Sequence, residues 1–329
     1  MRAAVAALAA GDFSAVLARF SGAVAGVSFE ANEVAPGMLQ ILRDPACPSL
    51  LLSVGVHGDE TAPIELVAQL LESLATQPDQ LAVNLLIVVG NLAAIAQARR
   101  FVDADLNRLF RQDQGDLAST REAARARLIV QMSRQFFDAA CGPRWHLDLH
   151  TAIRQSIYPT FAIMPDVIAL PQKRALLQLL GHAGIGAVIL NRSAAGTFSA
   201  FTAEQLGATS ATVELGRISA LGSNDMAKFD DAAMTLAALL RNKSIADTHA
   251  GLPEVFELAQ EIIKTSDAFV LHMDAATPNF APFAAGMIIA TDGAIIHRVG
   301  DREERVVFPN PSVRIGQRAG LMIVPATLG

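Results

Sequence analysis

The most constraining feature of this sequence is an alternation of short apolar runs with longer stretches of helical spacing, which continues to about residue 243. Each run has the length of a buried strand and is followed by Gly, Pro or polar residues. Helical patterns occupy residues 116–137 and 230–242. Strands that alternate with helices predict an open α/β sheet with helices on both faces. The strand candidates lie at 50–56, 85–89, 146–150, 160–164, 187–190 and 211–215.

Beyond residue 243 the helical patterns give way to short strands separated by Gly, Asp, Asn and Pro. Tripeptides such as Thr291-Asp292-Gly293 are typical of tight turns. We therefore predict two domains, a large α/β domain over residues 1–243 and a smaller β-rich domain over residues 244–329. The strand candidates of the second domain lie at 287–290, 294–299, 306–308 and 321–324.

Composition excludes several classes of protein. The chain has 329 residues, of which 52% are hydrophobic, so a large core can form and disorder is excluded. The net charge is −6 and long Lys/Arg runs are absent, which argues against a nucleic-acid partner. If the substrate is anionic, the binding site itself must supply positive charge.

The sequence also bears on location. No run of 18 apolar residues occurs, so we expect no transmembrane helix. Residues 1–10 resemble a signal peptide, but they are rich in Ala and amphipathic sequence follows at once, so we expect a surface helix and a cytoplasmic protein. Cys47 and Cys141 form no CxxC pair and predict buried free thiols in a reducing compartment. A homo-oligomer is possible, since nothing in the sequence defines the oligomeric state.

Three residues have the pattern of a hydrolytic zinc site. His57 and Glu60 follow the strand at 50–56 in a Gly-flanked loop, and His150 ends the strand at 146–150. A catalytic zinc ion takes three protein ligands and keeps one position for water, and two His with one Glu is a known set. The carboxyl ends of the strands in an open α/β sheet lie at one edge, which predicts that the three side chains meet there and bind one Zn²⁺ per chain.

The alternative is that these are ordinary residues, because His-x-x-Glu is frequent by chance and a strand histidine is usually a packed one. Asp148 lies two residues before His150 on the same strand face. It can orient the His150 ring as a hydrogen-bond acceptor, or it can be a buried acid with a local partner.

Glu214 lies inside an apolar strand, where an acid is unfavourable unless it has a partner or a chemical role. Beside a zinc-bound water it can act as the general base and then as the acid. The alternative is a salt bridge, for instance with Arg217.

Residues 99–110 mix charges with an apolar frame and contain Arg100, Asn107 and Arg108. Asn107 and Arg108 can bind a substrate carboxylate, and Arg100 can stabilise an oxyanion. The alternative is a solvated helix end. Arg154 is a further candidate for an anionic substrate.

Several motifs in order resemble the succinylglutamate desuccinylase and aspartoacylase family, and the similarity runs from about residue 50 to the end. The first-domain motifs are GVHGDETAP at 55–63, DLNR at 105–108, DLHTAIR at 148–154 and ELGR at 214–217. The second-domain motifs, which are similar to the desuccinylase branch, are LHM at 271–273, NFAPF at 279–283, FPNP at 308–311 and RAGLM at 318–322.

This resemblance implies a zinc carboxypeptidase-like catalytic domain followed by a β-rich domain. It implies hydrolysis of N2-succinyl-L-glutamate, a small anionic acyl-amino acid, to succinate and L-glutamate, the last step of the arginine succinyltransferase route of arginine catabolism. By resemblance His57, Glu60 and His150 would bind zinc, and Glu214 would be the catalytic acid and base. Arg100, Asn107 and Arg108 would match the substrate-contact segment.

Three residues depart from the family pattern and leave the acyl group open. Asp59 replaces the usual Asn, Gln155 the usual Gly and Arg217 the usual Lys of the desuccinylase branch. The alternatives are an aspartoacylase-like deacylase, a small carboxypeptidase, a carboxylate-binding protein without catalytic activity, and a structural zinc site. The presence of Glu214 argues against a binding protein. The lack of a fourth Cys or His ligand argues against a structural site.

Overall fold

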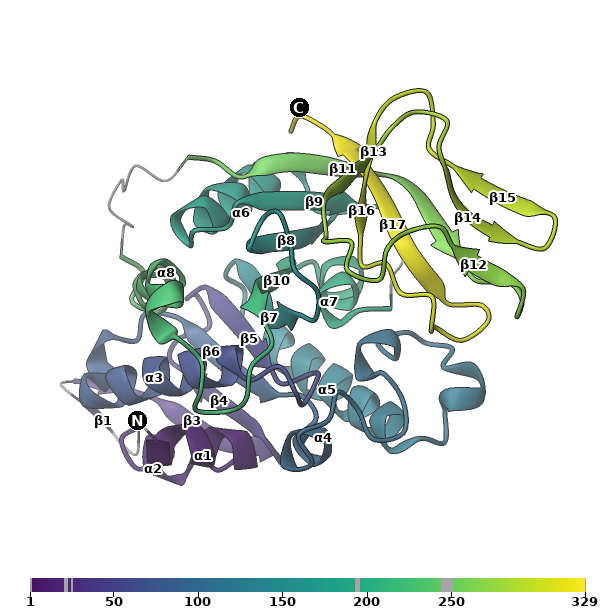
Figure 1. Cartoon of the computed structure of the whole chain (residues 1–329). Helices are drawn as coiled ribbons and strands as arrows, with labels where there is room; N and C mark the ends of the chain where they lie inside the picture. The colour runs from purple at the N-terminus through teal and green to yellow at the C-terminus, as the bar shows by residue number, and fades with distance from the viewer. Residues whose placement is uncertain (1, 21–22, 25, 193–195, 244–250, 329) are drawn as a thin grey trace.

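A computed structural model describes residues 2–20, 23–24, 26–192, 196–243 and 251–328. Its main feature is a mixed sheet of twelve strands, with helices on both faces (Figure 1). The predicted fold class, an α/β protein with an open mixed sheet and a smaller β-rich C-terminal part, is confirmed. The centre of the sheet contains the six predicted strands, β5 (Ser49–Val54), β6 (Asn84–Val89), β7 (Arg144–Ala152), β8 (Thr160–Pro165), β9 (Ala187–Asn191) and β10 (Thr209–Arg217).

Every residue of β5 and β6 is buried, because helices cover the sheet on both sides. Five helices pack with one face, α1 (Arg2–Ala10), α2 (Ser14–Leu17), α3 (Ala62–Thr76), α6 (Leu170–His182) and α8 (Asp230–Leu240). The opposite face carries α5 (Arg121–Asp138) and α7 (Phe198–Leu206). The short helix α4 (Leu92–Ala96) follows β6, and single 3₁₀ turns lie at Pro78–Gln80, Leu106–Arg108, Gly115–Leu117 and Met226–Phe229.

The predicted helix over residues 116–137 begins five residues late, at Arg121. The Thr120 hydroxyl accepts a hydrogen bond from the Ala123 N–H at 3.2 Å, which places the helix N-terminus there. A 3₁₀ turn precedes it at Gly115–Leu117. The edge strand β3 (Glu30–Ala35) and its neighbour β4 (Met38–Leu42) were not predicted. A short pair, β1 (Ala23–Val24) and β2 (Val27–Ser28), lies outside the sheet.

The C-terminal part continues the same sheet rather than forming a separate one. β11 (Glu254–Ile263), also not predicted, pairs in parallel with β9 and antiparallel with β17 (Arg318–Pro325). The end of the sheet then adds β16 (Glu304–Val307) and β13 (Ala281–Phe283). A second sheet contains β12 (Phe269–Leu271), β14 (Ile288–Asp292) and β15 (Ile295–Arg298). The shared sheet holds the C-terminal part beside the carboxyl ends of the central strands (Figure 1).

The N-terminal segment and the two cysteines lie at the periphery of the fold. The N-terminal segment is a helix, α1, whose Val5 and Leu8 are buried against α3. Both cysteines are free, but the prediction that they are buried is wrong, because Cys47 is half-buried and Cys141 is exposed in the loops that precede β5 and β7. Among the described residues we find no helix with the length and apolar character needed to cross a membrane.

Candidate active site

A tight loop after β5 brings His57 and Glu60 to the edge of the sheet. Gly58 lies against the backbone of α4, and a Cβ atom at this position would be 2.2 Å from the carbonyl carbon of Ala94. The Gly58 N–H also donates a hydrogen bond to the Arg100 carbonyl at 3.1 Å. Only glycine allows this approach, so the loop is fixed between α4 and the segment that carries Arg100.

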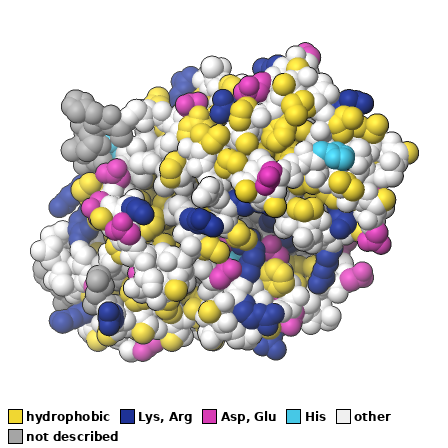
Figure 2. Space-filling view, in the orientation of Figure 1, with side chains coloured by type: hydrophobic (Ala, Val, Ile, Leu, Met, Phe, Trp, Pro, Cys, Tyr) yellow, Lys and Arg dark blue, Asp and Glu magenta, His cyan; other side chains and the backbone are white. Residues whose placement is uncertain are grey.

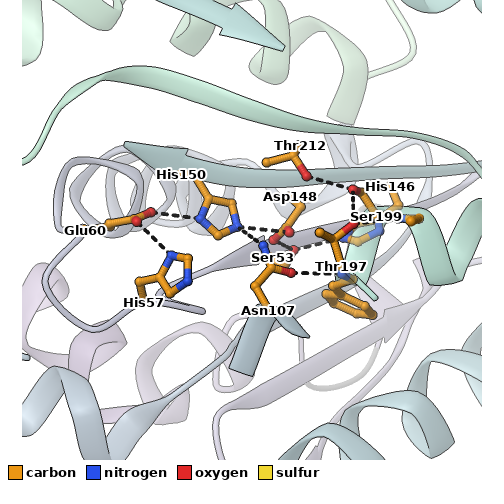
Figure 3. A network of polar contacts seen from close by, with 12 residues as sticks. Ser53, His57, Glu60, Asn107, His146, Asp148, His150, Thr197, Ser199 and Thr212 are labelled. Atoms are coloured by element: carbon orange, nitrogen blue, oxygen red, sulfur yellow. Dashed lines mark hydrogen bonds and ion pairs between the residues drawn. The ribbon is translucent and has the colours of Figure 1, made fainter. Parts of the chain in front are cut away.

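His57, Glu60 and His150 converge as predicted from their spacing (Figure 3). Each offers a ligand atom within 4.8 Å of those of the other two, and all three side chains are buried. The Nδ1 atoms of both histidines face the Glu60 carboxylate, at 2.7 Å for His57 and 2.8 Å for His150. The three side chains therefore point their donor atoms toward one small volume.

Carboxylates also lie on the far side of each ring. His150 Nε2 lies 3.0 Å from Asp148 Oδ2, and His57 Nε2 lies 3.0 Å from Asp105 Oδ1. Burial opposes the charged form of both rings, but the charges of Glu60 and Asp105 raise the pKa of His57, and those of Asp148 and Glu60 raise the pKa of His150 well above its ordinary value. Each carboxylate orients its imidazole with Nδ1 toward the centre of the cluster.

This donor set fits a divalent metal ion. Two imidazole nitrogens and a carboxylate oxygen are available, and the surrounding carboxylates supply an excess of negative charge that a cation would neutralise. The Glu214 carboxylate adds to this charge from the adjacent strand, where Glu214 pairs in register with His150.

Glu214 is 7% exposed, and its Oε2 atom has no hydrogen-bond partner. Burial, together with the negative charge of Glu60, raises the pKa of Glu214 to about 7. The positive charges of His150, Arg100 and His57 oppose this shift. A buried carboxyl with an unpartnered oxygen and a pKa near neutrality has the properties of a general base and acid.

The segment before α5 brings Arg100, Asn107 and Arg108 to the same place. Arg100 Nη1 lies 2.8 Å from Glu60 Oε1, so this guanidinium reaches the cluster. Asn107 is buried; its Oδ1 accepts from the Phe198 N–H at 3.0 Å, and its Nδ2 lies 3.5 Å from His150 Nε2. Arg108 Nη1 donates to the Asn107 carbonyl at 2.8 Å, and Arg108 has no carboxylate partner at ion-pair distance among the described residues.

These residues line a cavity of about 510 Å³ between the central strands and the C-terminal part. Figure 2 shows a hollow on this face with basic and acidic side chains around it. Arg154 lines the cavity and donates to the Ala275 carbonyl, so it also ties the loop after β7 to the C-terminal part. The opposite wall includes Asn279, Arg314 and Arg318.

None of the three departures from the family pattern lines this cavity. Arg217 and Gln155 are exposed, and Arg217 is thus no buried partner of Glu214. Asp59 lies beside the cluster and acts through its charge on Arg100.

Two positions were given no role on sequence grounds. Asp105 appears in the sequence only as part of the motif at 105–108. Its place two residues before Asn107 is the one feature of the sequence that could have suggested a role in the site. Glu122 is fully buried and accepts hydrogen bonds from the backbone N–H groups of residues 102–104 at 2.8–3.2 Å, so it supports the segment that carries Asn107 and Arg108. An acid in the first turn of a helix, such as Glu122, is common, so the sequence gives no indication of this role.

His146, four residues before His150 on β7, belongs to a buried chain of polar contacts that leads to the cluster (Figure 3). His146 Nε2 lies 2.9 Å from Ser53 Oγ, Ser53 donates to Asp148, and Asp148 holds His150.

Comparison with known proteins gives consistent results. Residues 46–240 match the succinylglutamate desuccinylase/aspartoacylase catalytic domain, and residues 252–326 match the barrel-sandwich hybrid domain of the same proteins. The chain is 43% identical to a succinylglutamate desuccinylase of Burkholderia thailandensis over 283 residues, which are 85% of this chain and 80% of that protein.

Solved structures show the same similarity. A succinylglutamate desuccinylase from Chromobacterium violaceum superposes with a TM-score of 0.80 at 35% identity, covering 95% of this chain and 96% of that one. One from Vibrio parahaemolyticus superposes with a TM-score of 0.82 at 28% identity, covering 95% of both chains. By sequence and by fold, this chain belongs to the succinylglutamate desuccinylase/aspartoacylase family.

Proposed function

We propose that this protein hydrolyses N2-succinyl-L-glutamate to succinate and L-glutamate, as the last step of the arginine succinyltransferase route, with one zinc ion per chain. The observation that carries the proposal is the buried His57–Glu60–His150 cluster beside Glu214, at a cavity that several arginines line. The names of the similar proteins, which share most of their length with this chain, support the same substrate.

In this proposal His57, Glu60 and His150 hold the zinc ion, and Asp105 and Asp148 keep the two rings in the required tautomer. When bound, the zinc ion supplies a Lewis acid that polarises the amide carbonyl and lowers the pKa of water. Glu214 removes a proton from the attacking water and gives it to the departing amine of glutamate. Its raised pKa suits both transfers near neutral pH.

The arginines account for an anionic substrate in a protein of net charge −6. Arg100 stabilises the negative charge that develops on the carbonyl oxygen, since it is the guanidinium nearest the cluster. Arg108 and the Nδ2 group of Asn107, whose one contact is a long one of 3.5 Å to His150 Nε2, bind a carboxylate of the substrate. N2-Succinylglutamate carries three carboxylates, so a cavity with several arginines is suited to it.

The remaining expectations are part of the same proposal. We place the enzyme in the cytoplasm, with no nucleic-acid or membrane partner. We retain the division into a catalytic domain over residues 1–243 and a β-rich domain over residues 244–329. The oligomeric state, including a homo-oligomer, is to be measured by light scattering.

The test is release of free amine from N2-succinylglutamate, N-acetylaspartate and a short peptide, each with zinc and after chelation. We expect rapid cleavage of succinylglutamate alone, lost on chelation and restored by zinc. If another compound is cleaved instead, and chelation stops its cleavage, the zinc chemistry is retained but the substrate is wrong. The protein would then be an aspartoacylase-like deacylase or a small carboxypeptidase. If the protein binds zinc but cleaves none of the compounds, we would conclude that it is a carboxylate-binding protein without catalytic activity.

A further inference from the structure

Arg318, the first residue of β17, lines the cavity from the C-terminal part of the chain. Its side chain is only 18% exposed, and the partner of its guanidinium is Glu261, with 3.5 Å between Nη1 and Oε1. Charge-assisted hydrogen bonds are usually about 2.7–2.9 Å long. A guanidinium has five N–H donors, so most of the hydrogen-bonding capacity of Arg318 is not used by the residues that the structure describes.

Arg125 shows how a structural buried arginine is satisfied in the same protein. Its guanidinium donates to the carbonyls of Gly90 at 2.8 Å, Pro36 at 2.8 Å and Val89 at 2.7 Å. Burial lowers the pKa of Arg125 to about 10, as it does for Arg318. Both arginines are therefore desolvated, but Arg125 donates three short hydrogen bonds to protein acceptors, whereas the one contact of the Arg318 guanidinium among the described residues is the 3.5 Å contact with Glu261.

A second arginine adds to the positive charge beside Arg318. Burial lowers the pKa of Arg318, and the positive charge of Arg108 lowers it further, against the attraction of Glu261. Arg108, from the 3₁₀ turn Leu106–Arg108, lines the same cavity and lies close enough for its like charge to act on Arg318. An anion between them would relieve the repulsion and fill the unused donors.

The same wall holds a buried donor without an acceptor. Asn279 is fully buried, and its Oδ1 accepts a hydrogen bond from the Phe308 N–H at 2.8 Å, which fixes the orientation of the amide. Its Nδ2 group has no partner among the described residues, but this atom is enclosed by the protein and does not face the open cavity. Asn279 therefore supports this wall and is not counted as a donor to the ligand.

We propose that Arg318 and Arg108 together bind a substrate carboxylate that lies away from the scissile amide. The C-terminal part of the chain is then a determinant of substrate specificity. This inference rests on the proposed function, because it takes an acylated dicarboxylic amino acid as the substrate. N2-Succinylglutamate has two such carboxylates, one at the end of the acyl group and one on the glutamate side chain.

The test is calorimetric binding to zinc-loaded Glu214→Gln protein, with and without Arg318→Gln. The probes are N2-succinylglutamate, N2-butyrylglutamate, which lacks the acyl carboxylate, and N2-succinylnorvaline, which lacks the side-chain carboxylate. We expect Arg318→Gln to weaken binding of succinylglutamate roughly 10- to 100-fold. The matched control is Arg298→Gln, which removes an exposed charge on β15 outside the cavity and should leave binding unchanged.

The two analogues identify the carboxylate. If the effect of Arg318→Gln disappears with butyrylglutamate, the pair binds the acyl carboxylate, and if it disappears with succinylnorvaline, the pair binds the side-chain carboxylate. An equal loss with all three probes, or no loss with any, would overturn the inference. So would a failure of every probe to bind when Arg318 is present. If binding depends on Arg318 but the wild-type protein hydrolyses none of the probes, the proposed function is overturned. The carboxylate site would still be supported.

Discussion

His146 makes the stability of this protein depend on pH in a defined window. Its imidazole is fully buried, with Nε2 2.9 Å from Ser53 Oγ and Nδ1 2.7 Å from Thr202 Oγ1. Burial lowers the pKa of His146 to about 4, and the positive charge of His150 acts in the same direction, whereas the charge of Asp148 opposes it. The ring lies between these two hydroxyls in a fully buried place, and the cost of burying its charge keeps it in the uncharged form in the folded protein.

The direction in which stability changes with pH follows from the number of protons bound by the folded and unfolded states. In the unfolded chain a histidine has a pKa of about 6.5, so between about pH 6.5 and 4 the unfolded state binds a proton that the folded state does not. Stability is therefore complete above pH 6.5 and falls with acidification until about pH 4. At about 1.4 kcal/mol per pH unit, lowering the pH from 7.5 to 5.0 removes on the order of 2 kcal/mol through this residue.

The assay is urea denaturation of chelator-treated protein at pH 7.5 and 5.0, for wild type and His146→Gln. The Gln amide can bond to both hydroxyls but does not titrate. We expect the free energy of unfolding of wild type to fall by about 2 kcal/mol more than that of the variant. His272→Gln, which replaces an exposed ring, should behave as wild type. If His146→Gln and wild type lose stability in parallel, to within about 0.5 kcal/mol, the buried neutral state of His146 is refuted.

Three further predictions concern the cluster and its loop. Glu214→Gln should retain one zinc ion per chain by metal analysis but lose roughly 10²- to 10⁴-fold in turnover; activity near that of wild type would remove Glu214 from the proton transfers. Asp105→Asn should weaken zinc binding roughly 10- to 100-fold in a competition titration, because the His57 ring loses its carboxylate acceptor; an unchanged affinity would contradict this role. Gly58→Ala should lower the free energy of unfolding by roughly 1–3 kcal/mol, because its Cβ meets the α4 backbone at 2.2 Å; a melting temperature equal to that of wild type would show that the loop can move away.

The strands of the sheet show which elements local sequence patterns can predict and which they cannot. The six central strands were predicted from short segments of strand length, most of them apolar, and in the structure β5 and β6 are buried at every residue. The edge strand β3 escaped prediction because its residues are partly exposed and include Glu30, Asn32 and Glu33. β11 escaped because its burial is mixed, and what makes it a strand is its pairing with β9 and β17.

The sequence by itself determined the chemistry that the chain brings together. Two histidines and a glutamate at strand ends predicted that the three side chains converge, because the ends of neighbouring parallel strands must meet at one edge. An acid inside the apolar strand β10 predicted a buried carboxyl beside that cluster. These inferences succeed because each depends on the position of a residue within one strand or loop.

Only the tertiary structure decided which distant groups complete the site. Asp105 reaches His57 across 48 positions of sequence, and the polar chain from His150 to His146 passes through Ser53 on another strand. The placement of Arg318 near Arg108 depends on the addition of β11 to the edge of the catalytic sheet. Such contacts are set by strand order and by the packing of one domain on another, and neither leaves a periodic or local pattern in the sequence.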